Sequence, residues 1–232
     1  MQSGACMTRR AKFDRSLLPD HPDLSFERDL WHRGLKMVAG VDEAGRGALA
    51  GPVAAGAVIL PSDATDLENC LAGVRDSKEM KPQDRDIWAA AIKENALAWA
   101  VGFASVEEID RIGILPATCL AISRAIGKMG LKVDHILVDY ITLPDAVVPQ
   151  TPLVKGDARS LSIACASILA KTTRDALLEA MDGEFPGYHF ASNKGYGTQA
   201  HREAIGELGP CPQHRRTFAP VRDYSSLFPS EL

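Results

Sequence analysis

Two neighbouring carboxylates, Asp42 and Glu43, follow the apolar run 37–41 and are separated by one alanine from a Gly-Arg-Gly turn at 45–47. Holding two negative charges at the end of a buried strand costs desolvation energy, which favours a bound cation or a shared proton. The glycines permit tight turning and expose backbone N–H groups to an anionic ligand. Such a stretch suits metal-dependent phosphoryl transfer. Taken alone, it equally suits a strand-end turn with solvated charges.

Two further acids repeat this setting. Asp139 ends the apolar run 136–138, and ligands of open α/β sheets gather at the carboxyl ends of strands, although such an acid also caps turns. Asp157 precedes an expected helix, so capping that helix is its alternative role. With Asp42 and Glu43 these residues offer four hard oxygen ligands, which suit Mg²⁺ or Mn²⁺. Two such ions about 3.5–4 Å apart can activate a water and stabilise the leaving oxygen of a phosphodiester.

The adjacency of Asp42 and Glu43 raises a geometric objection to this site. Neighbouring residues of a regular strand point to opposite faces, so both cannot face one site. Either the strand bends at Gly45, or one residue contributes from the side or through its backbone carbonyl.

The elements that must position these acids follow an α/β pattern. Strands are expected over 37–41, 53–60, 96–104 and 136–138, and helices over 82–95, 116–128, 161–181 and 199–208. Residues 26–32 form a short amphipathic turn, a capping box begins a helix at Ser105, and 144–152 reads as a polar, proline-rich loop. The first two strands are so close in sequence that they form an antiparallel hairpin. Because later strands alternate with helices, we expect a mixed sheet flanked by helices.

Composition narrows the class of protein. The chain has 232 residues, is 46% hydrophobic and carries a formal net charge of −4, as expected for one fairly large globular domain with or without appendages. No apolar run approaches the roughly 20 residues of a membrane span, and no secretory signal is visible. Five widely spaced cysteines without a Cys-x-x-Cys pair read as free thiols of a cytoplasmic protein. Mild acidity argues against a general polyanion binder but permits a local basic surface.

Several motifs occur in one order along the chain. They are Asp42-Glu43-Ala44-Gly45-Arg46-Gly47, Asp76-Ser77-Lys78, Asp139, Lys155-Gly156-Asp157, the stretch 162–175 and Lys194-Gly195-Tyr196. This ordered set resembles the bacterial ribonuclease HII family, a type 2 ribonuclease H, over about residues 36–222. The resemblance implies a ribonuclease H-like fold, with a mixed sheet flanked by helices and a helical C-terminal part. It also implies an endonuclease that cleaves RNA in RNA–DNA hybrids and nicks duplex DNA 5′ to single embedded ribonucleotides. The products would carry 3′-hydroxyl and 5′-phosphate ends, and the role would be ribonucleotide removal from DNA.

The resemblance implies roles for individual residues. The catalytic acids that bind Mn²⁺ or Mg²⁺ would be Asp42, Glu43, Asp139 and Asp157. The substrate-binding residues would be Gly45, Arg46, Gly47, Ser77, Lys78, Lys171 and Tyr196. In the family the glycine–arginine turn reads the ribose 2′-hydroxyl, which marks RNA, and the tyrosine stacks at the RNA–DNA junction.

Plain structural roles stand beside some of these assignments. Lys78 equally suits a solvated charge beside a helix. Lys171 suits a lysine that lays its stem along apolar surface, and Asp175 one turn later suits a surface ion pair with it. Between 188 and 222 the chain has a local basic surplus that indicates a phosphate-backbone surface or a solvated face: Lys194, Arg202, Arg215, Arg216 and Arg222.

The resemblance divides the chain into three parts. Residues 1–35 would be a partly ordered extension, 36–205 the catalytic domain, and 206–232 a segment that contacts substrate. The stretch Asp139-Tyr140-Ile141 departs from the family's usual Asp-Gly-Asn, so the turn after the acid must be built differently.

Other interpretations remain at this point. Ribonuclease HIII is the nearest, although the Gly-Arg-Gly turn and the lack of a large N-terminal binding domain argue against it. A ribonuclease H-fold integrase or junction nuclease, and a hybrid-binding module with a dead site, are further alternatives. We expect a monomer that acts on hybrids and ribonucleotide-containing duplexes, with no membrane association. Leu227-Phe228 is a faint candidate for a sliding-clamp contact.

Overall fold

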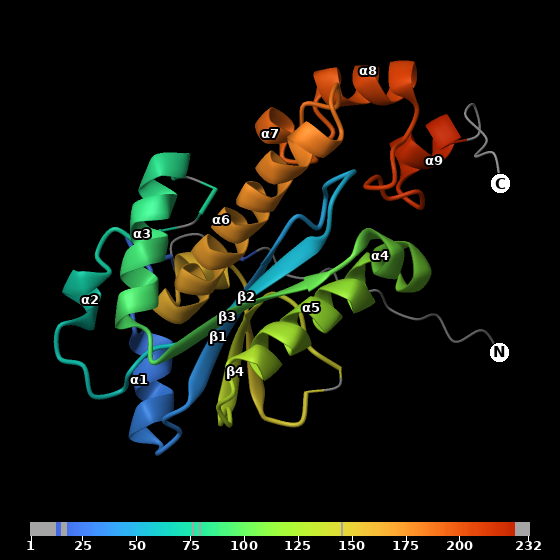
Figure 1. Cartoon of the computed structure of the whole chain (residues 1–232). Helices are drawn as coiled ribbons and strands as arrows, with labels where there is room; N and C mark the ends of the chain where they lie inside the picture. The colour runs from blue at the N-terminus through green and yellow to red at the C-terminus, as the bar shows by residue number, and fades with distance from the viewer. Residues whose placement is uncertain (1–12, 15–17, 76, 79, 145, 226–232) are drawn as a thin grey trace, which may run out of the picture.

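A five-stranded mixed sheet organises the chain in the computed structural model, which describes residues 13–14, 18–75, 77–78, 80–144 and 146–225 (Figure 1). The strands are β1 (Val38–Ala44), β2 (Val53–Ile59), β3 (Ala98–Ala104), β4 (His135–Asp139) and β5 (Gln150–Leu153). Their order in the sheet is β3-β2-β1-β4-β5. The hairpin partners β1 and β2 are antiparallel, as are β2 and β3, whereas β4 runs parallel to both β1 and β5. The predicted mixed sheet is confirmed.

Strand β5 corrects one sequence-based expectation. We expected a loop over 144–152, but Gln150–Leu153 pairs in parallel with β4, with Pro152 opposite Val138. Proline lacks an N–H donor and is tolerated in a strand at the edge of a sheet, which is where β5 lies. Its four residues show no alternation of apolar and polar side chains, so nothing in the sequence indicated a strand.

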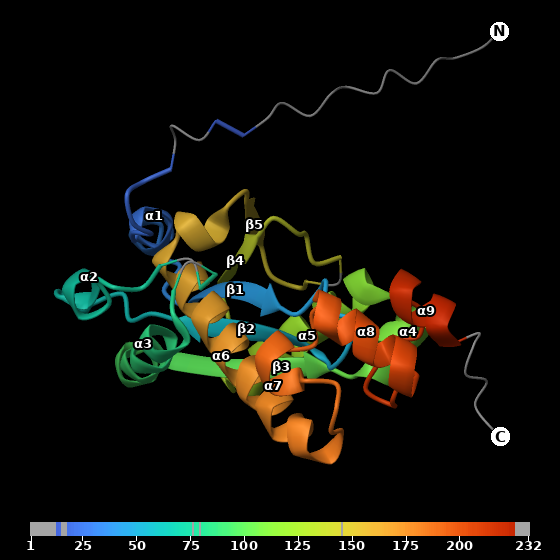
Figure 2. The ribbon, with the colours of Figure 1, turned by 90° about the horizontal axis from the view of Figure 1, so that it is seen from above.

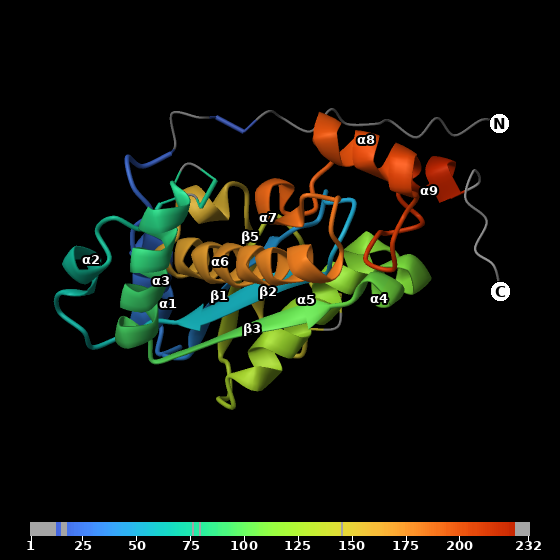
Figure 3. The same cartoon turned by 45° about the horizontal axis from the view of Figure 1, so that its top comes forward.

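Helices cover both faces of the sheet (Figures 1 and 3). The 24-residue helix α6 (Leu161–Glu184) packs on the face that carries Val38 and Val58, beside α3 (Pro82–Asn95). On the other face, α5 (Ile114–Lys128) packs against Ala39 and Ala57. Small residues allow α6 to lie unusually close to the sheet, because a Cβ atom on Gly56 would come within 2.1 Å of the carbonyl oxygen of Ala166.

Shorter helices complete the fold, and several begin where the sequence predicts. They are α1 (Ser25–His32), α2 (Leu67–Cys70), α4 (Val106–Ile112), the 3₁₀ turn Gly156–Ala158, α7 (Phe190–Asn193), α8 (Gln199–Leu208) and α9 (Ala219–Ser225). The capping box of Ser105 and Glu108 is present, and Thr198 caps α8 through its side chain. Helices α7, α8 and α9 form a helical C-terminal part at one end of the sheet, far from α1 and α2 (Figure 2).

The short amphipathic element expected near residues 26–32 is helix α1, which packs on the body of the domain. Leu30 and Trp31 join the core under α6, and Glu27 is fully buried. The Glu27 carboxylate accepts hydrogen bonds from the hydroxyls of Ser160 and Ser162, at 2.6 Å each, where α6 begins.

Two smaller expectations concern the rest of the chain. The described cysteines are free thiols, and the fifth, Cys6, lies outside the described residues, as do Leu227 and Phe228. Among the described helices, none combines the length and apolar character that crossing a bilayer requires.

Candidate active site

Asp42 lies at the centre of the acidic site. Positions 38, 40 and 42 of β1 face α6, since Val38 packs there and a Cβ atom on Gly40 would strike Ser162. The Asp42 side chain is therefore buried, with 4% of its surface exposed. Burial raises the pKa of Asp42 well above its usual range, and the charges of Glu43 and Asp139 raise it further.

Serines beside Asp42 hold it in place. A hydrogen bond from Ser167 on α6 opposes the rise in the pKa of Asp42. The Ser167 hydroxyl in turn lies 2.9 Å from the hydroxyl of Ser77. Ser77, expected to bind substrate, is only 3% exposed, so its side chain supports the acid from behind.

Asp139 and Asp157 approach the same site from the edge of β1 that pairs with β4. Asp139 ends β4, the parallel neighbour of β1, and its carboxylate accepts a 2.7 Å hydrogen bond from the Gly156 N–H. Burial, and then the charge of Asp157, raise the pKa of Asp139 to about 6. Asp157 is 3% exposed in the 3₁₀ turn. It does not cap α6, because the hydroxyl of Ser160 accepts the hydrogen bond from the Ile163 N–H.

Asp42 and Glu43 lie on opposite faces of β1, as a regular strand requires, so a contribution of Glu43 to the site from the side stays a prediction. Strand β1 continues through Ala44, so Glu43 points to the face opposite Asp42. Its carboxylate lies 2.9 Å from the Arg46 guanidinium, yet its charge still raises the pKa of both Asp42 and Asp139.

The four acids fit a hard divalent cation by their chemistry. All their donors are oxygens, and their mutual repulsion raises the pKa of Asp42 and Asp139, a cost that a cation would offset. Within the described ranges, no three His, Cys, Asp or Glu side chains converge closely enough to enclose a metal ion. Each of the carboxylates instead has a partner of its own: Ser167 for Asp42, Arg46 for Glu43, the Gly156 N–H for Asp139, and Lys78, at 3.4 Å, for Asp157.

The Gly-Arg-Gly turn and the Tyr196 loop lie side by side next to these acids. The N–H groups of Leu49 and Ala50, just after the turn, donate to the Gly195 carbonyl at 2.7 and 3.2 Å. Tyr196 is 36% exposed, and the Lys171 ammonium lies 5.4 Å from the centre of its ring. The expected reader of ribose and the expected stacking residue thus share one surface.

Lys171 pairs with Asp175 as the alternative role predicted, at 2.8 Å. The pair is not on the open surface, because its side chains are only 17% and 10% exposed. Arg85 adds a second contact to Asp175 at 3.4 Å. Lys171 is therefore fixed beneath Tyr196, and Lys78, with 72% of its side chain exposed, is the more accessible lysine of the site.

The turn after Asp139 is built by Tyr140 in a left-handed conformation, with φ of +61°. Its N–H donates to the carbonyl of Leu153, and the Ile141 N–H donates to the carbonyl of Asp139. Such a backbone costs a residue with a side chain roughly 1 kcal/mol that glycine avoids. Tyr140 is 56% exposed, directly after Asp139 in the chain.

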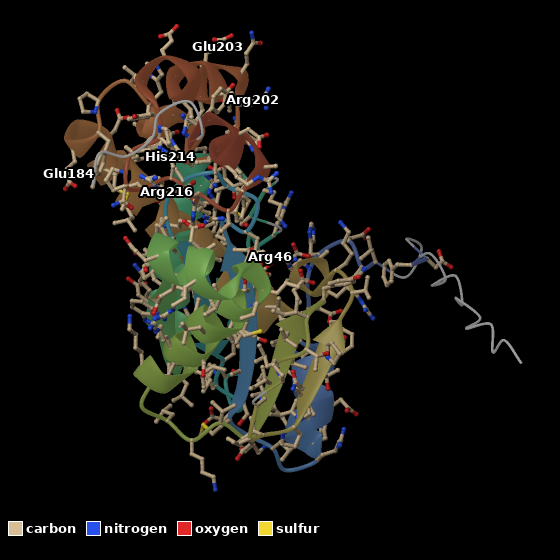
Figure 4. The ribbon with its side chains drawn as sticks, turned by 90° about the vertical axis from the view of Figure 1, so that its right-hand side faces the viewer. Arg46, Glu184, Arg202, Glu203, His214 and Arg216 are labelled. Atoms are coloured by element: carbon tan, nitrogen blue, oxygen red, sulfur yellow. The ribbon has the colours of Figure 1, made fainter. Side chains whose placement is uncertain are left out.

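The sequence analysis did not predict that two arginines near this site are buried. Arg174 and Arg215 are both 0% exposed, although Arg215 was expected on a basic surface. Lys194, another member of that predicted surface, is paired with Glu179. The basic side chains that remain exposed there are those of Arg202, Arg216 and Arg222. Figure 4 shows Arg46 at the end of the sheet, below the C-terminal part that carries His214 and Arg216.

Comparisons with known proteins agree with this architecture. The sequence model of the family described as Ribonuclease HII matches residues 39–221. A ribonuclease HII of Synechococcus sp. (strain JA-3-3Ab) is 54% identical over 202 residues, which cover 87% of this chain and 90% of that protein.

Solved structures share the fold. Ribonuclease H2 of Pyrococcus horikoshii OT3 superposes with a TM-score of 0.67 at 25% identity, covering 84% of this chain and 99% of that one. Bst-RNase HIII in complex with Mn²⁺ superposes with a TM-score of 0.62 at 19% identity, covering 84% and 71%. The latter likeness concerns the fold alone.

Proposed function

This chain belongs to the ribonuclease HII family and is a ribonuclease H hydrolase, and from that premise we propose its substrate and mechanism in finer detail. It nicks duplex DNA on the 5′ side of a single embedded ribonucleotide and also cleaves the RNA of RNA–DNA hybrids. The products carry 3′-hydroxyl and 5′-phosphate ends, and the role is ribonucleotide removal from DNA. The observation that carries this proposal is the grouping of Asp42 with three other acids beside the turn 45–47 and Tyr196.

Divalent cations are the cofactors, held by Asp42, Glu43, Asp139 and Asp157. When bound, two such ions supply an activated water and stabilisation of the leaving oxygen of the phosphodiester. Either Mg²⁺ or Mn²⁺ suits four carboxylates. A protein of the same fold, Bst-RNase HIII, has been solved in complex with Mn²⁺, which supports a divalent cofactor.

The protein's own residues position the substrate. The turn Gly45-Arg46-Gly47 receives the ribose whose 2′-hydroxyl distinguishes RNA from DNA. The exposed ring of Tyr196 offers a stacking face to the adjoining base or sugar. Lys78 reaches toward Asp157 from an exposed position, where its ammonium can contact the phosphate. Ser77 and Lys171 act indirectly. Ser77 supports Asp42 through Ser167, and Lys171 supports the ring of Tyr196.

The catalytic unit comprises residues 36–205, and the segment 206–232 contributes to substrate binding. The protein works as a monomer. A sliding-clamp contact through Leu227 and Phe228 is a further part of this proposal, carried by the sequence alone, since these residues lie outside the described part of the chain.

The experiment compares three labelled substrates with Mg²⁺ or Mn²⁺: a duplex with one ribonucleotide, the same duplex in all-DNA form, and a long RNA–DNA hybrid. Wild type should nick the first on the 5′ side of the ribonucleotide and leave the second intact, whereas Asp139→Asn should cut neither. Cutting of the long hybrid alone would indicate a specificity like that of ribonuclease HIII. Binding without any cutting would leave only the hybrid-binding module.

A further inference from the structure

Arg174 joins three loops of the substrate surface from beneath. Its Nε donates to the Pro52 carbonyl at 2.9 Å, and its two Nη atoms donate to the carbonyls of Lys194 and Ala50, at 2.8 and 3.0 Å. The Gly45 backbone also rests on it, because a Cβ atom there would lie 2.0 Å from Nε. The guanidinium thus underlies the turn 45–47, the following segment and the Tyr196 loop, whose ring lies 5.5 Å away.

Arg215 repeats this arrangement from the C-terminal part. Its Nε donates to the Gly51 carbonyl at 3.0 Å, and Nη1 donates to the Arg46 carbonyl at 2.9 Å. Its other nitrogen, Nη2, is buried without a hydrogen-bond partner. The turn 45–47 is therefore bonded directly to a residue 169 positions further along the chain.

The two guanidiniums keep their positive charge without a carboxylate partner. In the portion of the chain that the structure describes, no carboxylate oxygen pairs with either within 4.0 Å. The acids whose charges act on these arginines, Asp175 on Arg174 and Asp110 on Arg215, are bonded to other groups. Asp175 pairs with Lys171 and Arg85, and Asp110 accepts hydrogen bonds from residues 216 and 217. Burying a charge is costly unless it is paired, so an anion outside the loops would offset this cost.

We propose that Arg174 and Arg215 form a buried positive base beneath the turn 45–47 and the Tyr196 loop, the surface that receives the substrate's phosphodiester backbone. They act as positioning residues: they turn the carbonyls of three loops inward and supply, through a thin layer of backbone, the charge that attracts phosphate. This inference rests on the proposed function and deepens it. It adds a positive charge that helps a chain of net charge −4 to attract a polyanion.

Charge and geometry can be separated by paired substitutions. Arg174→Met and Arg215→Met remove the charge, whereas Arg174→Lys and Arg215→Lys keep it but lose the forked hydrogen bonds. Arg28→Met is the matched control, since Arg28 is an exposed arginine of α1, at the far end of the sheet, paired with Glu68. Affinity for the duplex with one ribonucleotide is measured by fluorescence anisotropy at several salt concentrations, with a chelator to prevent cleavage.

Each Met variant should bind at least fivefold more weakly at low salt and lower the slope of log Kd against log salt by about 1. Each Lys variant should restore the slope, and Arg28→Met should match wild type. Equal weakening by Met and Lys with an unchanged slope would overturn the proposal, because loop packing alone would then explain the loss. Folded Met variants that bind like wild type would overturn it as well.

A second measurement holds even where a Met variant does not fold. In ¹⁵N-labelled wild type, the Nε–H signals of buried arginines are protected from exchange and can be assigned by their loss in the Lys variants. Titration with a short all-DNA duplex should shift both signals, and the absence of a shift would contradict the proposal. If wild type cuts ribonucleotide-containing duplexes while these tests fail, only the inference is lost. If wild type cuts no substrate, the proposed function itself is wrong.

Discussion

The Nε2 atoms of His201 and His214 lie 3.0 Å apart inside the helical C-terminal part, where the two side chains are 0% and 1% exposed. The Cys211 N–H donates to Nδ1 of His214, so the proton of that ring is on Nε2. His214 therefore donates to His201, whose own proton on Nδ1 is donated to the Tyr196 carbonyl at 2.9 Å. Two neutral histidines thus connect the C-terminal part to the exposed tyrosine.

This pair predicts acid sensitivity of the fold. Burial, and then His201, lower the pKa of His214 to about 4, from 6.5. The unfolded state thus binds protons that the folded state rejects. The stability is present above pH 6.5 and is lost as the pH falls toward 4, by on the order of 3 kcal/mol. Urea unfolding across this range should show the loss, and His214→Gln, though less stable, should show a flatter dependence. An equally steep dependence in the variant would assign the effect to other groups.

Asp139→Asn should abolish cleavage and stabilise the metal-free protein. Without a complete set of acids, several kcal/mol of transition-state stabilisation is lost, so the rate should fall roughly 10³-fold or more. The pKa of Asp139 is raised to about 6, which means that its charge is unfavourable near neutral pH without metal. The Tm in chelator should therefore rise for Asp139→Asn, and the increase in Tm that Mn²⁺ gives to wild type should shrink. A lower Tm in chelator would contradict this electrostatic account.

Metal affinity should fall in acid. Protons compete with the cation for Asp139 below about pH 6, so Mn²⁺ affinity should decrease by up to about tenfold per pH unit there. Calorimetric titration in two buffers with different ionisation enthalpies should detect the released protons. Affinity that stays constant between pH 7 and 5 would exclude Asp139 as a ligand with a raised pKa.

Two substitutions of Tyr196 distinguish stacking by its ring from hydrogen bonding by its hydroxyl. Loss of the ring in Tyr196→Ala should weaken the binding of a ribonucleotide-containing duplex by about 1–3 kcal/mol, whereas Tyr196→Phe keeps the stacking face and should stay near wild type. The ring is accessible, with 36% of the residue exposed, so neither change should lower the Tm substantially. Equal losses in both variants would point to the hydroxyl.

The two glycines of the turn should respond differently to alanine. A Cβ atom on Gly45 would lie 2.0 Å from Arg174, and the φ of +90° there already disfavours a side chain. Gly45→Ala should therefore lower the Tm by at least about 4 °C, given that 1 kcal/mol corresponds to roughly 2–4 °C at this size. Gly47 has nothing within 4 Å, so Gly47→Ala is the matched control and should keep the wild-type Tm. Thermal unfolding of the two variants decides between local strain and a general sensitivity of the turn.

The acids of the site were predictable because strand ends leave a clear sequence pattern. Apolar runs ending in Asp42 and Asp139 predicted two strands that end in acids, and the structure makes these strands, β1 and β4, parallel neighbours. Ser105 likewise predicted the start of a helix, because a capping box depends only on residues close in sequence. Local signals of this kind survive in a single sequence.

The supporting residues were not predictable, since their roles depend on contacts between distant segments. Arg174 looks like a polar residue of an amphipathic helix, and only the approach of three loops makes it fully buried. Substrate binding by Ser77 stays a prediction, whereas its contact with Ser167, 90 positions away, has no local signal in the sequence. Strand β5 was missed for a related reason, because its pairing with β4 supplies a regularity that Gln150–Leu153 lack by themselves.

The buried carboxylate of Glu27 sets where the smallest stable version of this protein can begin. Asp23 and Ser160 form a parallel bridge, and Glu27 accepts hydrogen bonds from Ser160 and Ser162 at the start of α6. A chain trimmed to the start of the family match, at residue 39, would lose all of these partners. The first turn of the longest helix would then face water. The folding unit therefore begins well upstream of the stretch that the family model matches.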